Sequence, residues 1–228
     1  MSTHLAILGT GMVGQALAEG FTRADYDVTI GTRDVDAALA RTASTPRGAP
    51  GFGDWHSAHP GIGVTTIAEA ADAADIIVLA VAGANAPEAL SLADPESLTG
   101  TTVIDVTNPL VFAPDALPSL SVVNTDSIGE LLQRTFPEAN VVKTLNTVTA
   151  PIMIDPKSLD DGNHTMFVAG NDAGAKDEVR ALLIALGWHD LLDLGDITAA
   201  RGMEMYLPLW LRMRMAFDSP MFSIKVVR

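Results

Sequence analysis

The sequence predicts a doubly wound α/β domain whose sheet is mainly parallel, with a small α/β extension at its C-terminal end. Apolar strand-like segments alternate with helical segments along the chain. The first strand runs straight into a glycine-rich turn that opens a helix, and residues 76–81 are apolar throughout. Strands without polar positions are typical of parallel sheets buried on both faces. We expect residues 1–150 to form the main domain and residues 151–228 a small C-terminal domain.

The elements follow one another in the order that such a sheet requires. Strands are expected over residues 4–8, 27–30, 64–66, 76–81, 102–106, 141–145 and 165–169, and helices over residues 13–23, 67–74, 127–135, 173–186 and 198–217. Pro208 should break the last helix near Leu207, because proline disrupts a helix interior. That helix is apolar enough to pack on the sheet or on a second subunit, so a homodimer is one expectation.

Residues 42–63 interrupt this order. The segment is dense in Gly, Pro and Ser and is too long for a plain connection. We expect a mobile flap or an insertion. His56 and His59 lie within it and are expected to be solvated, and two histidines without carboxylates at ligand spacing predict no metal site.

Composition narrows the classes of function. Twenty-eight acidic and 14 basic side chains give a formal net charge of −14, which disfavours nucleic acid and anionic lipid surfaces as partners. There is no cysteine, so thiolate chemistry and cysteine-held metals are excluded, and redox chemistry must come from a bound cofactor. We also expect a cytoplasmic protein without a membrane span, because no apolar run approaches the roughly 20 residues that a span needs.

The glycine-rich turn has the pattern G-x-G-x-x-G, at the place where this motif binds dinucleotides. Its six residues are Gly9, Thr10, Gly11, Met12, Val13 and Gly14. The first glycine permits the tight turn, the second lets backbone N–H groups approach a pyrophosphate, and the third lets helix and strand pack closely. The partial positive charge of the helix N-terminus favours the same anion. The motif predicts a Rossmann-type dinucleotide site.

The end of the second strand indicates which dinucleotide binds. An NAD site has a carboxylate at the strand tip for the ribose 2′-hydroxyl. Here the tip carries Thr32 and Arg33, and Asp34 comes one position too late. A hydroxyl and a guanidinium suit a 2′-phosphate, because the planar arginine fork matches phosphate oxygens. The sequence favours NADP(H).

Groups that could transfer a proton to a small substrate are scarce. Lys143 lies in a strand and is interpreted as an edge lysine that reaches solvent, while His164 and His189 are interpreted as structural or exposed. About 60 residues follow Val168, too few for the large helical domain that carries the lysine of 3-hydroxyacid dehydrogenases. A planar redox partner, which takes hydride from ring to ring, fits this shortage.

Several segments together resemble the NADPH-dependent reductases of the deazaflavin coenzyme F420. They are AILGTGMVGQALAEG, VTIGTRD, ADIIVLAV, VIDVTNP, VVKTLNTV and ITAARGMEMYLPL, and they cover essentially the whole chain except residues 42–63. The resemblance implies hydride transfer between NADP(H) and a deazaflavin. It also implies a nucleotide domain, a C-terminal part that helps to close the cofactor cleft, and a dimer.

Carried over by residue, the resemblance places the glycine turn on the pyrophosphate and Thr32 with Arg33 on the 2′-phosphate. It places Ala80, Val81 and Ala82 beside the nicotinamide half, and Asn146 and Thr147 as the catalytic pair where the two rings meet. Asn108 is also expected to bind the cofactor. Family members that use the deazaflavin have histidine where this chain has Asn146, and relatives with the Asn-Thr pair use a flavin. The resemblance therefore allows either a deazaflavin or a flavin as the hydride acceptor.

Two other functions fit the residues. One is an NADPH-dependent reductase of a small carbonyl or imine, with Lys143 or a water molecule as the proton donor. The other is a module that senses NADP(H) without chemistry. They differ in whether NADPH is oxidised and by which acceptor.

Overall fold

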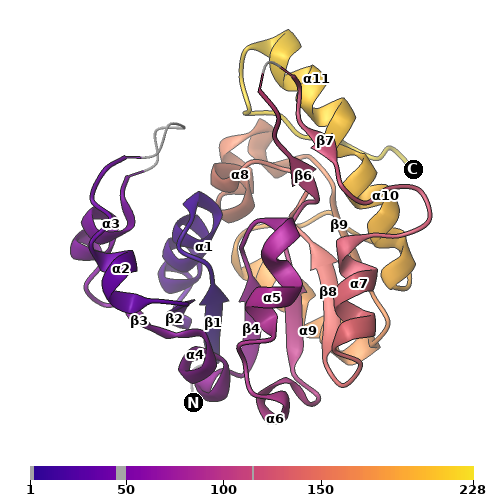
Figure 1. The fold of residues 1–228 in the computed structure, drawn as a ribbon. Coiled ribbons are helices and arrows are strands. Elements are labelled where there is room, and N and C mark those ends of the chain that lie inside the picture. The colour runs from indigo at the N-terminus through magenta and orange to yellow at the C-terminus, as the bar shows by residue number, and fades with distance from the viewer. Residues whose placement is uncertain (1–2, 45–49, 115) are drawn as a thin grey trace.

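The computed structural model describes residues 3–44, 50–114 and 116–228 (Figure 1). The strands are β1 (His4–Leu8), β2 (Asp27–Thr32), β3 (Gly63–Thr66), β4 (Ile76–Leu79), β5 (Thr102–Asp105), β6 (Leu110–Val111), β7 (Ser119–Leu120), β8 (Asn140–Thr144), β9 (Met166–Gly170) and β10 (Leu191–Asp193). The α-helices are α1 (Met12–Arg23), α2 (Val35–Leu39), α3 (Phe52–Ala58), α4 (Ile67–Ala73), α5 (Ala86–Leu90), α6 (Pro95–Leu98), α7 (Ile128–Thr135), α8 (Ala150–Ile154), α9 (Ala173–Ala185), α10 (Ala200–Met205) and α11 (Leu207–Phe217). Four short 3₁₀ turns are η1 (Gly83–Asn85), η2 (Pro156–Ser158), η3 (Asp160–Gly162) and η4 (Ile197–Ala199).

Eight strands form one sheet in the order β10-β9-β8-β5-β4-β1-β2-β3. All neighbours pair in parallel except β8 and β9, which are antiparallel. Strands β9 and β10, from the last third of the chain, extend the same sheet, while β6 and β7 form a separate hairpin. The predicted α/β class with a mainly parallel sheet is confirmed.

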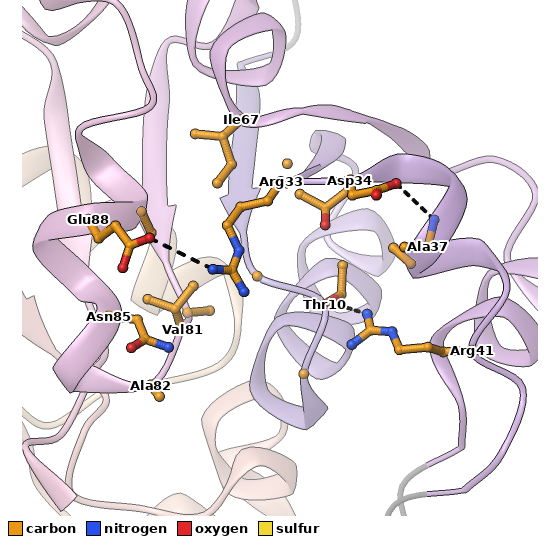
Figure 2. A pocket seen from close by; sticks show the side chains of 17 residues that line it. Thr10, Arg33, Asp34, Ala37, Arg41, Ile67, Val81, Ala82, Asn85 and Glu88 are labelled. Carbon is orange, nitrogen blue, oxygen red and sulfur yellow. Dashed lines mark hydrogen bonds and ion pairs between the residues drawn. The ribbon is translucent and has the colours of Figure 1, made fainter.

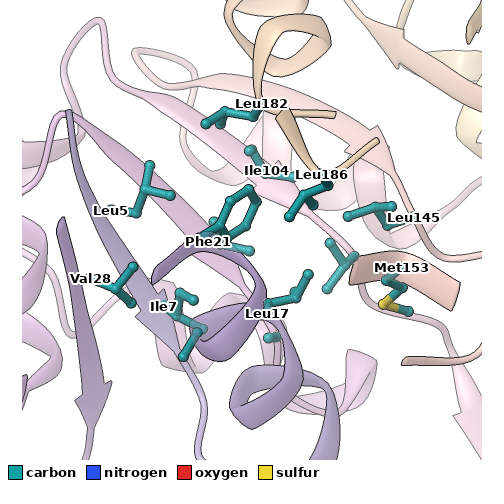
Figure 3. Packing of buried hydrophobic residues seen from close by; sticks show 14 of the residues in the cluster. Leu5, Ile7, Leu17, Phe21, Val28, Ile104, Leu145, Met153, Leu182 and Leu186 are labelled. Atoms are coloured by element: carbon teal, nitrogen blue, oxygen red, sulfur yellow. The ribbon is translucent and has the colours of Figure 1, made fainter. Parts of the chain in front are cut away.

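Helices cover both faces of this sheet, and the alternation of side chains along β1 shows how. Leu5 and Ile7 belong to the core on the face of α1, where Leu17 and Phe21 pack against them (Figure 3). Ala6 and Leu8 point to the other face and belong to a second core under α4, α5 and α7. Full burial of each large apolar side chain contributes about 1.5–3 kcal/mol, so both faces stabilise the sheet.

The direction in which successive strands are added to the sheet reverses between β1 and β4. From β1 the chain moves outward through β2 and β3, and then returns to β4 on the other side of β1. Ligands of open α/β sheets bind in the crevice at such a reversal, beyond the carboxyl ends of the strands. This topology places a candidate site beyond the ends of β1 and β4.

Residues 50–63 decide between the two expectations for this segment. They form helix α3 and its flanks, and Phe52 and Trp55 are buried in the main core, with their rings stacked at a centroid distance of 5.7 Å. The segment is thus an inserted helix that packs on the fold and not a mobile flap, while residues 45–49 lie outside the described residues. Gly53, one of the glycines that suggested a flap, serves close packing, because a Cβ there would lie 2.0 Å from Leu39 O.

The C-terminal helix breaks where the sequence predicts. Helix α10 ends at Met205 and α11 begins at Leu207, with Pro208 in its first turn. The fourth strand ends at Leu79, two residues earlier than expected, and α2 was not anticipated. None of the helices in the described ranges is long and apolar enough to cross a membrane.

Candidate functional site

A cavity of about 370 Å³ opens beyond the carboxyl ends of β1, β2 and β4 (Figure 2). The predicted cofactor residues Gly9, Thr10, Gly11, Thr32, Arg33, Ala80, Val81 and Ala82 all line it. Met12, Val13 and Gly14 form the first turn of α1, directly after this lining. The cavity therefore unites the glycine turn with the tips of the second and fourth strands.

Each of the three glycines of the turn lies in different structural surroundings. Gly9 has a φ of +130°, and a Cβ there would lie 2.5 Å from Ala80 O. A Cβ on Gly14 would lie 2.0 Å from Gly9 O. Gly11 has no protein atom near its missing Cβ within 4 Å, although it lines the cavity. The fold requires Gly9 and Gly14, whereas the open space at Gly11 fits a pyrophosphate at the helix N-terminus.

The tip of β2 presents a weakly paired guanidinium, that of Arg33, and a carboxylate that caps a helix, that of Asp34. Asp34 Oδ1 accepts a hydrogen bond from Ala37 N at 2.9 Å, so Asp34 caps α2. Arg33 Nη1 lies 3.9 Å from Glu88 Oε1, and both side chains are about two-thirds exposed, at 67% and 69%. Such an exposed pair is weak, about 0–1 kcal/mol, so a phosphate can displace Glu88 from Arg33.

Arg41 is a second cation of this cavity, and no motif in the sequence pointed to it. It follows α2, which the sequence pattern did not reveal, and its Nη2 donates a hydrogen bond to Thr10 Oγ1 (Figure 2). Arg41 and Arg33 approach the cavity from different elements.

The remaining predicted site residues form a separate polar cluster. Asn146 Nδ2 donates to Asn108 Oδ1 at 3.0 Å and to Met203 O at 3.1 Å, and Asn108 Nδ2 donates to Asn146 O at 2.9 Å. Asn146 and Thr147 are buried and do not line the 370 Å³ cavity. Asn146 Oδ1 is buried without a hydrogen-bond partner among the described residues. Leu145, just before it, has a φ of +60°, a conformation that costs a bulky residue energy.

Lys143 corrects the interpretation as an edge lysine in solvent. Strand β8 lies between β5 and β9, and the side chain is 0% exposed. Its Nζ lies 2.9 Å from Asp105 Oδ2 and 2.9 Å from Glu204 Oε1, and it donates to Thr107 O at 2.6 Å. Burial alone would lower the pKa of Lys143, but attraction to Asp105 and Glu204 outweighs it and raises the pKa. Lys143 is therefore charged and inaccessible to solvent.

Glu204 and Arg201 attach α10 to α7. Glu204 accepts hydrogen bonds from Ile128 N at 2.9 Å and Gly129 N at 3.2 Å, at the N-terminus of α7. Arg201 Nε donates to Glu130 Oε2 at 2.8 Å in the same helix. The two residues thus fix α10, whose Met203 carbonyl holds the Asn146 carboxamide.

The histidines take structural positions. His56 and His59 are partly buried and not solvated as expected: His56 Nε2 lies 3.0 Å from Ile62 O, and the His59 ring stacks on Trp55 at 4.6 Å. His164 is buried against the Trp188 ring. Across the described ranges, no group of three His, Cys, Asp or Glu side chains could hold a metal ion.

Comparison with known proteins places this site in a family. Residues 4–109 match the model of the family "NADP oxidoreductase coenzyme F420-dependent". A crystal structure from Arthrobacter sp. FB24, provisionally described as an F420-dependent NADP reductase, is 47% identical, with a TM-score of 0.93 over 98% of this chain and 99% of that one. No protein of curated function matches the chain.

More distant structures share the fold. A hypothetical protein of Sinorhizobium meliloti is 22% identical, with a TM-score of 0.68 over 100% of this chain and 96% of that one. A reductive aminase of Aspergillus terreus in complex with NADPH and ethyl levulinate is 18% identical, with a TM-score of 0.63 over 95% of this chain but 63% of the longer aminase. With 47% identity to the Arthrobacter protein over nearly its full length, the chain belongs to the coenzyme F420-dependent NADP oxidoreductase family and is an NADP-dependent oxidoreductase.

Proposed function

We propose that this enzyme transfers hydride between NADP(H) and a planar redox acceptor, a deazaflavin of the F420 type or a flavin. The observation that carries the proposal is the burial of Lys143 in an ion pair. This lysine was the candidate proton donor for a small substrate, and it is fully buried between Asp105 and Glu204. A carbonyl or imine could not reach it without breaking a buried ion pair, which costs about 3–5 kcal/mol.

The residues of the cavity fit the dinucleotide. We assign the pyrophosphate to Thr10, Gly11 and the N-terminus of α1, because Gly11 leaves open space there and the first turn of α1 carries no acidic residue. Thr32 and Arg33 would hold the 2′-phosphate, and Ala80, Val81 and Ala82 the nicotinamide half.

The proposed contact with the hydride acceptor depends on the carboxamides of Asn108 and Asn146. NADPH supplies a hydride at C4 of its nicotinamide ring, and an isoalloxazine-like ring can accept it without a nearby protein acid. A buried acceptor atom without a partner is costly, and Asn146 Oδ1 is one. We assign this atom, with Thr147, to orienting a ring or carboxamide N–H at the junction of the two rings. Residues 151–228 would close this end, because α10 holds Asn146 through Met203 O.

Two alternatives have less support. A small-carbonyl or imine reductase would need a proton donor other than Lys143. The imine-reducing neighbours are under 25% identical and share the fold alone. A non-catalytic NADP(H) sensor would bind the dinucleotide and leave it intact.

Stereospecifically deuterated NADPH separates these functions. Purified enzyme is offered the deazaflavin, FMN, FAD and a panel of carbonyls and imines, each with NADPH labelled on one face of C4. The proposal expects deuterium, undiluted by solvent, on the ring carbon of a reduced deazaflavin. A flavin accepts hydride on a ring nitrogen whose N–H exchanges with water, so for FMN or FAD the proposal expects a primary isotope effect on flavin reduction and loss of the label from NADPH. Turnover with a carbonyl alone contradicts it, and tight binding without oxidation of NADPH indicates the sensor.

We also propose a homodimer through the surface of α11 and the β6–β7 hairpin, which are both found toward the same end of the molecule (Figure 1). This surface exposes Leu209, Met215, Phe217 and Val111. Apolar patches of this kind are unusual on monomers. Sedimentation velocity should give a dimer for the wild type, and Leu209→Glu with Met215→Glu should give a folded monomer.

A further inference from the structure

Arg41 stands at the cavity without a role in any site described so far. It follows α2, and its guanidinium donates to Thr10 Oγ1 in the glycine turn. The turn itself is hydrogen-bonded to the tip of β2, since Gly9 N donates to Gly31 O at 3.1 Å. Thr10 therefore lies beside the strand end that carries Thr32 and Arg33. Arg41 thus faces the same part of the cavity as Arg33, from another wall (Figure 2).

The inserted helix α3 determines where Arg41 lies. Gly53 N donates to Arg41 O at 2.8 Å, so the first turn of α3 is bonded to the arginine's own backbone. The contact leaves no room for side chains: a Cβ on Gly51 would lie 2.5 Å from Arg41 O, and one on Gly53 would lie 2.0 Å from Leu39 O. Phe52 and Trp55 anchor α3 in the core below. The insertion is built against the segment that ends in Arg41.

The present partners of the two arginines are weak ones. Arg41 donates to a neutral hydroxyl, and Arg33 lies 3.9 Å from an exposed carboxylate. A guanidinium binds a phosphate dianion more strongly than a hydroxyl, through charge and a bidentate geometry. A phosphate between the two walls would draw both side chains to itself.

We infer that Arg41 is a second ligand of the NADP 2′-phosphate, and that the inserted helix α3 is the scaffold that holds it there. Arg41 is then a specificity-determining residue, and the inserted helix has a function in the choice of dinucleotide. The inference rests on the proposed placement of NADP(H) in this cavity.

Equilibrium binding tests whether Arg41 contacts the 2′-phosphate. Dissociation constants for NADPH and NADH are measured by nucleotide fluorescence, and those for 2′,5′-ADP and 5′-ADP by calorimetry. Arg41→Ala should weaken NADPH and 2′,5′-ADP by about tenfold or more, the usual effect of losing a charge-assisted contact, and leave NADH and 5′-ADP within about twofold. The affinity of Arg41→Lys for NADPH should lie between those of the wild type and Arg41→Ala. Arg212→Ala, on the distant helix α11, is the matched control. Equal loss for both dinucleotides would mean a pyrophosphate contact and overturn the inference, as would no loss at all.

A second pair of variants tests the scaffold. Gly53→Ala forces α3 away from Leu39, whereas Gly61→Ala, in the same insertion, meets no atom within 4 Å. Gly53→Ala should show the selective loss of NADPH that Arg41→Ala shows, and Gly61→Ala should bind as the wild type does. If Gly53→Ala does not fold, Trp55→Phe, which loosens α3 from below, takes its place. A folded scaffold variant with unchanged NADPH binding contradicts the scaffold role.

No acceptor enters these measurements. A wild type that prefers NADPH but passes hydride to no ring acceptor contradicts the proposed function alone. A wild type that prefers NADPH while Arg41→Ala keeps its full affinity contradicts the inference alone.

Discussion

Lys143 and Asp105 are direct partners in the register of β8 and β5, and their charged groups lie 2.9 Å apart in the centre of the sheet. Glu204 completes the group from α10. A lysine and two carboxylates near the carboxyl ends of central strands would suggest catalysis in a cleft, but here the side chains of Lys143, Asp105 and Glu204 are buried, and Lys143 is paired with both carboxylates. Their role is to hold α10 and α7 against the sheet.

Lys143→Met should therefore destabilise the protein more than it disables the chemistry. It leaves Asp105 and Glu204 buried without a counter-charge, which costs about 3–5 kcal/mol of unfolding free energy. Urea unfolding measures this loss, and turnover is measured at a temperature where the variant is folded. A stable variant without activity would instead make Lys143 a catalytic residue.

Arg33→Ala should weaken NADPH binding by about 1.5–3 kcal/mol and leave NADH binding nearly unchanged. Glu88→Gln should act in the opposite direction, because it removes the carboxylate that lies 3.9 Å from Arg33. Neither change should alter thermal stability by more than about 1 kcal/mol, since the pair is exposed. Equal loss of NADPH and NADH in Arg33→Ala would exclude a 2′-phosphate contact.

Gly11→Val and Gly14→Val form a matched pair within one turn. The first places a branched side chain where the protein has no atom within 4 Å, so the fold should persist while nucleotide binding is lost. The second places a Cβ 2.0 Å from Gly9 O and should prevent folding. Circular dichroism and NADPH titration distinguish the two, and retained affinity in folded Gly11→Val would leave the motif a packing role only.

Glu130 should contribute to acid sensitivity. The hydrogen bond from Arg201 lowers the pKa of Glu130 below its usual 4.5. A carboxyl with a lowered folded pKa stabilises the fold above its unfolded pKa, and this contribution disappears as the pH falls through the folded pKa. The stability difference between wild type and Glu130→Gln should be constant near neutrality and shrink below about pH 4.5. Thermal unfolding across pH checks this, and parallel curves down to pH 2 would contradict it.

Asn146→Ala should lower turnover without a new pKa in the pH–rate profile, because the carboxamide orients rings and does not carry a proton. It also removes the hydrogen bonds to Asn108 and Met203, so stability should fall by about 1–3 kcal/mol. Rate measurements from pH 5 to 9 with saturating NADPH decide this point. A titration that appears or vanishes in the variant would mean that Asn146 acts on a proton.

The sequence predicted what depends on local pattern. The glycine turn, the apolar strand 76–81 and the break before Pro208 each depend on neighbouring residues, and each lies where it was expected within two residues. The partners of Lys143 could not be predicted in this way, because Asp105 and Glu204 lie 38 positions before it and 61 after it. Sequence order does not state which strand borders which, and the lysine was therefore assigned to an edge.

Arg41 and α3 were missed for a different reason. Glycine, proline and serine dominate residues 42–63, and this composition is shared by flexible loops and by segments that pack backbone against backbone. The spacing of Phe52 and Trp55 could have distinguished the two cases, because aromatic residues three apart form a small apolar face on one helical turn.

The bond of Glu204 to the N-terminus of α7 also bears on how the chain is made. Synthesis on the ribosome releases residues 1–150 well before residue 204 emerges, and until then Ile128 N and Gly129 N have no carboxylate and Lys143 has one of its two counter-ions. We therefore expect residues 1–150 not to fold stably without α10. A nascent chain should remain open to proteases until α10 arrives, and a chain that ends before residue 204 should be degraded.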